Sequence, residues 1–303
     1  MNLLCSVSVI DTPLTVICLS SILQLMLIDS HTHIFPQEYK KSHESILKID
    51  NTYADLFQKD SPPADAESLV GSMKQHGISK SIVLGMGWTD YKLAQDINDY
   101  LIESSKTHQG KLIPFCSINP AWGNDALYEL ERCFNRGAKG IGELHPDTQD
   151  FDITSYAEMR SIMQFCEEKH LPVLIHCSEP IGHSYPGKGQ THPSKLIDFI
   201  TNFPSNIIIC AHFGGGLPFY SLMPEIRTSL ANVYFDSAAA PYLYDPDVYK
   251  NVEQLLGSKH ILFGSDYPVV SHRRSLDHLM KTGMDSDSFM DITHNNIMDI
   301  LSS

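Results

Sequence analysis

Short apolar runs alternate with longer amphipathic segments along most of this chain, and this alternation limits the folds open to it. The runs are four to eight residues long and are separated by stretches of helical character, such as 66–76, 90–107, 124–136, 155–169, 194–202 and 247–256. Eight runs occur, at 25–29, 81–85, 111–118, 138–144, 172–177, 206–212, 232–237 and 260–266. Apolar strands that alternate with helices predict a parallel sheet buried on both faces.

The spacing of these runs predicts how the sheet is arranged. The residues taken as strand ends, from His33 to Asp266, lie 25 to 36 residues apart except for a first interval of 52, and a strand with its helix needs about 30 residues. No GxGxxG motif follows the first run, which argues against a dinucleotide-binding doubly wound sheet. We therefore predict an α/β fold, a single (β/α)8 or TIM barrel, with one domain over residues 26–303.

The N-terminal segment needs a separate explanation. Residues 12–28 carry no charge, but the segment lacks the positive region and the cleavage site of a signal peptide. It is also slightly short for a membrane span. We expect Met26 to be the true start and residues 1–25 to be an extension outside the fold, with a secretion signal as the alternative.

Charge and cysteine usage limit the partners and the compartment. The chain has 22 Lys and Arg against 36 Asp and Glu, a net charge of −14, which disfavours binding to nucleic acid or to an anionic membrane. We expect a small-molecule substrate. The seven Cys form no CxxC pair, which predicts reduced thiols and a cytoplasmic protein. The oligomeric state, a homo-oligomer included, stays open.

Two long connections are candidates for binding loops. Residues 34–65 fill the long first interval, and residues 178–193 are dense in Gly, Pro and polar side chains. Both follow predicted strands, so in a barrel both lie on the face where active sites are built. We expect 34–65 to be a lid, a binding loop or a disordered segment.

Histidines and acids gather at the predicted strand ends. His31 and His33 form an HxH pair whose side chains point the same way on a strand, so that both can reach one ion. An HxH pair alone is weak evidence, but other strands end in similar residues: Glu143, His176, His212 and Asp266. Six side chains able to bind a metal therefore lie at the catalytic rim of five strands.

At this point the sequence resembles the amidohydrolase superfamily, and within it the amidohydrolase-2 branch with its aminocarboxymuconate semialdehyde decarboxylase-like enzymes. The resemblance rests on DSHTHIF (29–35), KGIGELHP (139–146), LIHCSEP (174–180), AHFGGGLP (211–218) and FGSDYP (263–268). It implies that His31, His33, His176 and Asp266 bind a divalent ion, usually Zn²⁺. It also implies that His212 binds a second ion or handles protons.

Glu143 departs from this branch, in which many relatives carry Lys at that position. Two-metal members of the superfamily use a carboxylated Lys or a Glu there as a bridging ligand, so the six residues could hold two ions. The alternative is that Glu143 only pairs with a nearby His or Arg. TatD-type nucleases also have a Glu on this strand, but the GGGLP and GSDYP segments fit amidohydrolase-2 better.

The main functional prediction is a metal-dependent hydrolase of a small ester, lactone or amide. A divalent ion lowers the pKa of water to about 7, and we expect Asp266 to take its proton and His212 to bind the second ion or steady the oxyanion. The alternative is a decarboxylase acting on a small aromatic or conjugated carboxylate, with His212 as acid and base. A barrel that binds metal without catalysis is disfavoured, because an open coordination position has no structural use. Candidate substrate contacts are His183, Tyr185, Lys188, Tyr242, Tyr244 and Arg273.

Overall fold

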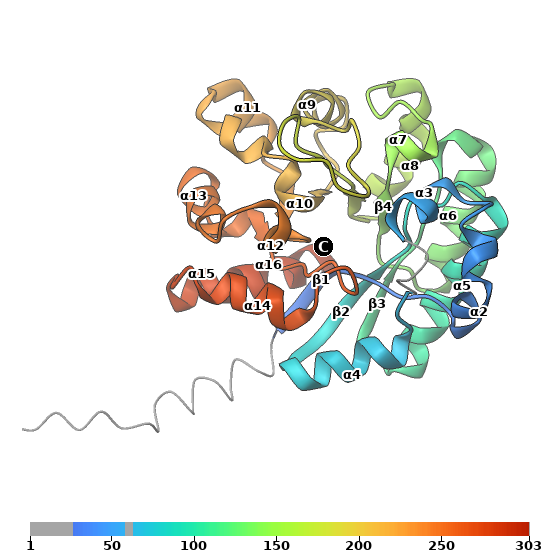
Figure 1. Cartoon of the computed structure of the whole chain (residues 1–303). Helices are drawn as coiled ribbons and strands as arrows, with labels where there is room; N and C mark the ends of the chain where they lie inside the picture. Colours follow the sequence, from blue (N-terminus) through green and yellow to red (C-terminus); the bar gives the residue numbers. More distant parts are fainter. Residues whose placement is uncertain (1–26, 58–62, 303) are drawn as a thin grey trace, which may run out of the picture.

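The computed structural model describes residues 27–57 and 63–302, and the predicted extension 1–25 lies outside them. All eight predicted strands are present: β1 Leu27–His33, β2 Ile78–Leu84, β3 Leu112–Phe115, β4 Ile141–Leu144, β5 Val173–Ile175, β6 Ile208–Cys210, β7 Val233–Asp236 and β8 Ile261–Leu262. Helices lie around them (Figure 1). The main ones are α4 Ala66–His76, α5 Tyr91–Thr107, α6 Asn124–Arg136, α8 Tyr156–Glu168, α9 Pro193–Asn202, α11 Pro224–Ser229, α13 Asp247–Leu256, α14 His272–Met280 and α16 Asn296–Ser302.

The strands pair in parallel and in chain order. They form a three-stranded sheet, β1-β2-β3, and a five-stranded sheet, β4-β5-β6-β7-β8. Isolated parallel bridges join the two sheets at both seams, one between Cys116 and Ile141 and one between Thr32 and Tyr267. The prediction of a (β/α)8 barrel is confirmed.

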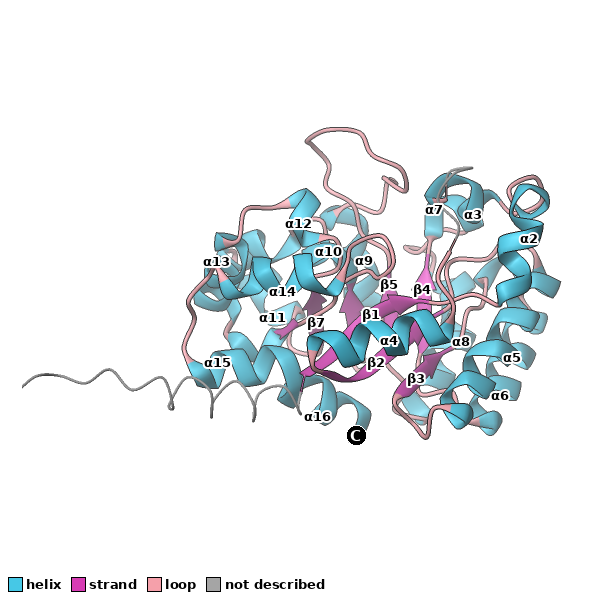
Figure 2. Ribbon diagram, turned by 60° about the horizontal axis from the view of Figure 1, so that its bottom comes forward, coloured by secondary structure: helices cyan, strands magenta, loops and turns pink. Residues whose placement is uncertain are grey.

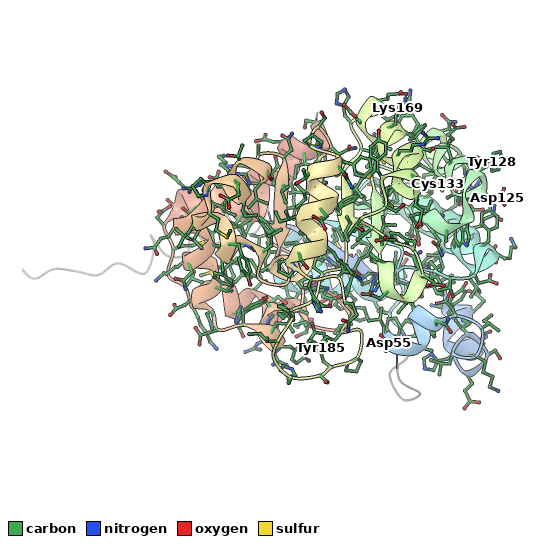
Figure 3. The ribbon with its side chains drawn as sticks, turned by 90° about the horizontal axis from the view of Figure 1, so that it is seen from above. Asp55, Asp125, Tyr128, Cys133, Lys169 and Tyr185 are labelled. Carbon is green, nitrogen blue, oxygen red and sulfur yellow. The ribbon has the colours of Figure 1, made fainter. Side chains whose placement is uncertain are left out.

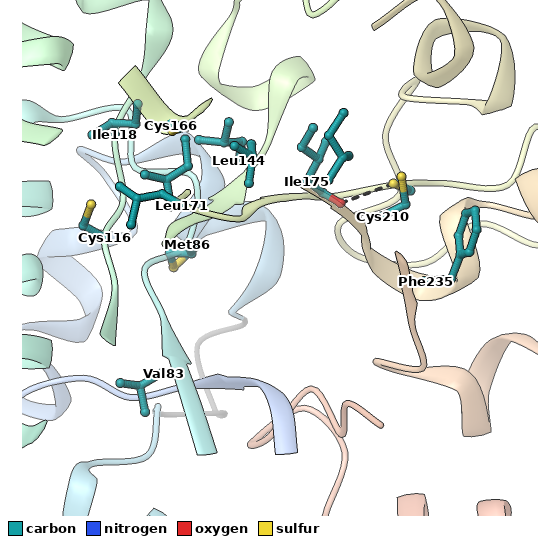
Figure 4. Packing of buried hydrophobic residues seen from close by; sticks show 14 of the residues in the cluster. Val83, Met86, Cys116, Ile118, Leu144, Cys166, Leu171, Ile175, Cys210 and Phe235 are labelled. Atoms are coloured by element: carbon teal, nitrogen blue, oxygen red, sulfur yellow. Dashed lines mark hydrogen bonds between the residues drawn. The ribbon is translucent and has the colours of Figure 1, made fainter. Parts of the chain in front are cut away.

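Alternate residues along the strands belong to two apolar layers. In β2, Val83 packs with the large cluster beneath the helices, whereas Ile82 and Leu84 belong to a second, smaller cluster. Ile297 and Ile300 of α16 also pack in the smaller cluster. Figure 4 shows part of the large cluster, in which Val83, Met86, Ile175 and Phe235 are buried. The core therefore lies on both faces of the strands, which leaves their C-terminal ends free to carry a site.

Local signals fix the ends of the outer helices where the sequence predicts them. Asp65 and Asp90 accept hydrogen bonds from the first turns of α4 and α5 as N-caps. Gly77 ends α4 and Gly137 ends α6, both with left-handed backbone (φ 72° and 112°). These caps explain why α4 and α6 match the predicted ranges; α13 also matches its predicted range.

The connection 34–65 contains two short helices that the sequence pattern does not predict, α2 Gln37–Ile46 and α3 Asn51–Leu56. Asp50 caps α3 by accepting a hydrogen bond from the backbone N–H of Tyr53. Tyr53 and Phe57 are buried with Trp88, and the rings of Tyr53 and Trp88 stack with their centroids 5.8 Å apart. Burial of these rings supplies the packing that short helices need.

Further short helices follow the strand ends: α7 Pro146–Gln149 after β4, α10 Ala211–Gly214 after β6 and α12 Ala240–Leu243 after β7. The connection 178–192 after β5 has no helix and extends well above the strands (Figure 2). Within the described ranges, no helix is both long and apolar enough to cross a membrane.

Candidate metal centre

The six predicted ligands meet at the C-terminal ends of the strands, and all are buried. Their ligand atoms fall into two groups of three, each with its atoms within 4.8 Å of one another. The first group is His31, His33 and Asp266, and the second is Glu143, His176 and His212. The parallel barrel explains the gathering, because it brings the ends of distant strands to one rim.

Glu143 lies between the two groups. Its Oε2 is 3.4 Å from His31 Nε2 and 3.5 Å from His33 Nε2. Its Oε1 is 2.9 Å from His176 Nδ1 and 3.4 Å from His212 Nε2. One carboxylate therefore faces both groups, as a bridging ligand would.

In three of the histidines, the ring nitrogen that does not face the other ligands donates a hydrogen bond to an oxygen outside the centre. The contacts are His31 Nδ1 to Asp236 Oδ2 (2.8 Å), His212 Nδ1 to the Ala238 carbonyl (2.9 Å) and His176 Nε2 to the Gly187 carbonyl (2.9 Å). A carbonyl oxygen only accepts, so in the neutral ring the other nitrogen presents a lone pair to the centre.

Lone pairs and carboxylates that converge in a buried space need a cation. His31 Nε2 and His33 Nε2 are only 3.2 Å apart, and Asp266 Oδ1 is 3.6 Å from His33 Nε2. Repulsion among these atoms would oppose the arrangement unless a proton or a metal ion lay between them. Imidazole and carboxylate donors suit a divalent transition metal. The residues present therefore fit a metal ion.

The pKa values of the ligands reflect the same demand for positive charge. Burial works against protonation of His31, yet Asp236 and Glu143 hold its pKa well above the usual value. Burial also opposes protonation of His212, but Glu143 and Asp266 raise its pKa to about 9. Burial raises the pKa of Asp266. The upward shifts of the two histidine pKa values follow from the carboxylates that surround them.

Two site residues have unusual backbone. His212 and Asp266 have φ of 55° and 67°, in the left-handed region that residues with a Cβ rarely adopt. Each such residue costs about 1–3 kcal/mol, and strain of this kind gathers at functional sites. Packing around the strand ends must therefore offset the backbone strain that positions these two side chains.

A cavity of about 370 Å³ opens onto the ligands. It has ligand residues at one side and apolar or aromatic residues around them: Leu56, Phe57, Met86, Tyr185, Tyr242, Leu243 and Val269. His183 also lines it, so three of the predicted substrate contacts (His183, Tyr185 and Tyr242) border the cavity. Apolar walls around a few converging polar groups are typical of a small-molecule site.

The other three predicted contacts do not line the cavity. Lys188 Nζ donates to the carbonyls of Ile181 and His183. The Tyr244 hydroxyl donates to Glu179. Arg273 lies in a separate groove beyond α12, with its side chain 80% exposed.

Lys188 and Arg273, predicted as substrate contacts, therefore do not border this cavity. Arg273 is the second residue of α14, and that helix buries a different face, with His272, Ser275 and Leu279. Helix periodicity then turns Arg273 toward solvent. Its nearest carboxylate is Asp277, with 3.6 Å between Nε and Oδ2.

Sequence reasoning missed two residues of the site. His145 is buried, lines the cavity and stacks on His176 with 4.3 Å between ring centroids. Its position two residues after Glu143 could have revealed it, because alternate residues of an extended segment share a side. Asp236 ends β7, and no local pattern marks it, because its role depends on contact with His31. Burial lowers the pKa of His145 to about 4.

Comparisons with known proteins agree with this geometry. The amidohydrolase-2 family model, described as amidohydrolase, matches residues 28–281. This chain belongs to the amidohydrolase family. By sequence, no curated protein matches it.

Solved structures with the same fold include decarboxylases. The 5-carboxyvanillate decarboxylase of Sphingomonas paucimobilis has a TM-score of 0.74 at 14% identity, over 92% of this chain and 99% of that one. The dihydroxybenzoic acid decarboxylase of a Polaromonas species, with bound manganese and 2-nitroresorcinol, has a TM-score of 0.71 at 17% identity, over 91% and 97%. A structure named amidohydrolase II has a TM-score of 0.72 at 19% identity, over 91% and 100%. These likenesses show that the chain shares the fold of these proteins.

Proposed function

We propose that this protein is a metal-dependent decarboxylase that releases CO2 from a small aromatic or conjugated carboxylate. The observation that carries the proposal is the composition of the cavity: among the described residues that line it there is no Lys or Arg. A substrate carboxylate would find a lasting positive charge there only at a cation held by the six ligands. The apolar and aromatic walls would accept the rest of the substrate.

The residues have distinct tasks in this reaction. A divalent cation supplies a Lewis acid that stabilises the negative charge left when CO2 departs. The bond to the carboxyl carbon breaks with its electron pair left on the substrate carbon, and one proton must reach that carbon. His212 borders the cavity, and we assign it to hold and deliver this proton while the other ligands of the centre hold the cation. The cavity walls exclude water from the developing charge.

The proposed metal is Zn²⁺ or Mn²⁺. Four of the six ligands are imidazoles, which suit zinc, and the two carboxylates also accept manganese. Manganese is bound in two neighbouring decarboxylase structures. Elemental analysis of purified protein would identify the ion.

A hydrolase with two ions is the second candidate, and Glu143 is the observation that favours it. Its two oxygens face separate groups of ligands, and paired ions are typical of hydrolytic sites. The metal content would separate the candidates. Two ions per chain, with one lost in Glu143→Ala, would support hydrolysis, whereas one ion retained in that variant would support the decarboxylase.

Assays of the metal-loaded protein test the proposal directly. We expect CO2 release from a panel of hydroxylated benzoates and conjugated carboxylates, and loss of that activity after treatment with a chelator. Hydrolysis of lactones, esters or amides without CO2 release would replace the first candidate by the second. Activity that persists after complete metal removal would contradict both.

A further inference from the structure

Glu179 joins two segments that border the cavity. It lies just after β5, in the connection 178–192, which we call loop five. Its Oε2 accepts a hydrogen bond from the Tyr185 hydroxyl and its Oε1 accepts one from the Tyr244 hydroxyl, each at 2.8 Å. Tyr185 belongs to loop five, and Tyr244 follows α12 on the far side of β6. One half-buried carboxylate thus holds two segments together.

The three-glycine run after His212 holds the base of loop five close to β6. Gly215 has φ of 58°, and a Cβ atom there would lie 2.2 Å from the Ser178 carbonyl oxygen. No side chain larger than hydrogen fits at that distance. The segments after β5, β6 and β7 therefore meet around Ser178 and Glu179.

The far part of loop five reaches the metal ligands. The Gly187 carbonyl accepts the hydrogen of His176 Nε2 (2.9 Å), and the Tyr185 ring lines the cavity. A Cβ on Gly187 would lie 2.5 Å from Leu56 Cδ2 of α3, so the loop extends across to that helix. Figure 3 shows Tyr185 on this loop, close to the helix that carries Asp55.

The contacts of Glu179 suit a fastening role. Each tyrosine donates to a different carboxylate oxygen, and a hydrogen bond to a charged group is stronger than a neutral one. Burial together with the nearby Glu179 carboxylate raises the pKa of both tyrosines, so both stay protonated donors at neutral pH. The nearby Lys188 ammonium bonds to loop carbonyls and lies over the Tyr185 ring (5.5 Å to the centroid).

We propose that Glu179 is a positioning residue that fastens loop five to the segment after α12, and thereby places the Tyr185 wall and the Gly187 carbonyl that orients His176. Only the part of this inference that concerns turnover rests on the proposed function. The effect on the loop and on metal affinity is independent of the reaction.

Trypsin offers a direct measure of the loop, because Lys188 is its only Lys or Arg between residues 178 and 192. We expect zinc-loaded Glu179→Ala to be cut after Lys188 at least about tenfold faster than the native protein, since two hydrogen bonds to a charged group are lost. Mass spectrometry of the fragments 1–188 and 189–303 identifies the cut. Glu225→Ala, an exposed change in α11, is the matched control and should match the native rate.

A second readout is the affinity for Zn²⁺ in competition with a chelator. We expect Glu179→Ala to bind zinc about tenfold more weakly, because a ligand that loses its outer hydrogen bond is held less firmly. Glu179→Gln and Tyr244→Phe keep part of the hydrogen bonding between Glu179 and the two tyrosines, and both should give intermediate values in both assays. These two variants decide the matter if Glu179→Ala does not fold.

The outcomes separate this inference from the proposed function. Native cleavage rates and native zinc affinity in all three variants would show that Glu179 does not position loop five. If the Glu179 contacts act during turnover, KM for a carboxylate substrate that the protein decarboxylates should rise more than kcat falls in Glu179→Gln. Faster cleavage and weaker zinc binding in the variants, in a protein that releases no CO2, would support the positioning role of Glu179 and contradict the proposed decarboxylase function.

Discussion

At the scale of single residues, the centre depends on side chains that do not touch the reacting space. Asp236 has no exposed surface, and it holds His31 by accepting the hydrogen of Nδ1. Its other oxygen accepts the backbone N–H groups of His212 and Ala238. One carboxylate therefore aligns a ligand from each of the two groups, His31 through its ring and His212 through its backbone.

Replacement of Asp236 by Asn should weaken metal binding without unfolding the protein. The amide can present its NH2 group to His31 and so favour the wrong ring tautomer, and loss of such partners typically costs about 10- to 100-fold in affinity. Competition with a chelator measures the change. Asp245→Asn, at an exposed turn, is the control, and native affinity in Asp236→Asn would show that the contact does not matter.

At the scale of elements, a buried carboxylate of α6 forms a hydrogen bond to α5 and an ion pair within its own helix. Glu129 of α6 has no exposed surface and accepts hydrogen bonds from Asn98 of α5 (2.7 Å) and from Arg132 (2.7 Å to Nε). Burial alone would raise the pKa of Glu129, but these donors lower it below the usual value. The charged carboxylate is therefore part of the helix packing.

We expect Glu129→Gln to lower the free energy of unfolding by about 1.5–3 kcal/mol near neutral pH, because the buried position loses its charge-assisted hydrogen bonds while Arg132 keeps only its ion pair with Asp99. The stabilisation by Glu129 is complete above the unfolded-state pKa near 4.5 and is lost as the pH falls through the lower folded-state pKa. The difference between variant and native protein should thus shrink in acid. Urea titrations at several pH values measure it, with the exposed Glu131→Gln as control, and a constant difference would contradict the assignment.

Two glycines of different elements should respond to alanine in opposite directions. Gly71 is exposed within α4 and has open space where a Cβ would lie, so Gly71→Ala should stabilise the protein by about 0.5–1 kcal/mol. Gly215→Ala should destabilise it by more than about 1 kcal/mol, because its φ is positive and the Ser178 carbonyl blocks the Cβ. Thermal unfolding of both variants tests the pair, and stabilisation by both would show that loop five does not pack as described.

At the scale of the whole molecule, a metal ion at this centre would tie together strands from both sheets. Its ligands come from the ends of β1, β4, β5, β6 and β8. An ion that binds only the folded chain stabilises it by mass action, by about 2.7 kcal/mol at a free concentration of 100 times Kd.

Removal of metal should therefore lower the unfolding temperature by about 5–10 °C for a domain of this size. Addition of Zn²⁺ or Mn²⁺ to the chelator-treated protein should restore it, and circular dichroism during heating records the change. His33→Ala should not respond to added metal in the same way. Equal unfolding temperatures with and without metal would count against a metal at this centre.

The eight strands, most outer helices and the gathering of six ligand side chains could be predicted from the sequence. These follow from local periodicity, capping residues and the rule that parallel strands end at one rim, so each can be read from neighbouring residues. Contacts in the folded chain were needed to show that residues 37–46 and 51–56 form helices and that Arg273 faces solvent away from the cavity. They were also needed to show that Asp236 and the Gly187 carbonyl orient His31 and His176. Those outcomes depend on contacts between segments far apart in the chain, which local patterns do not encode.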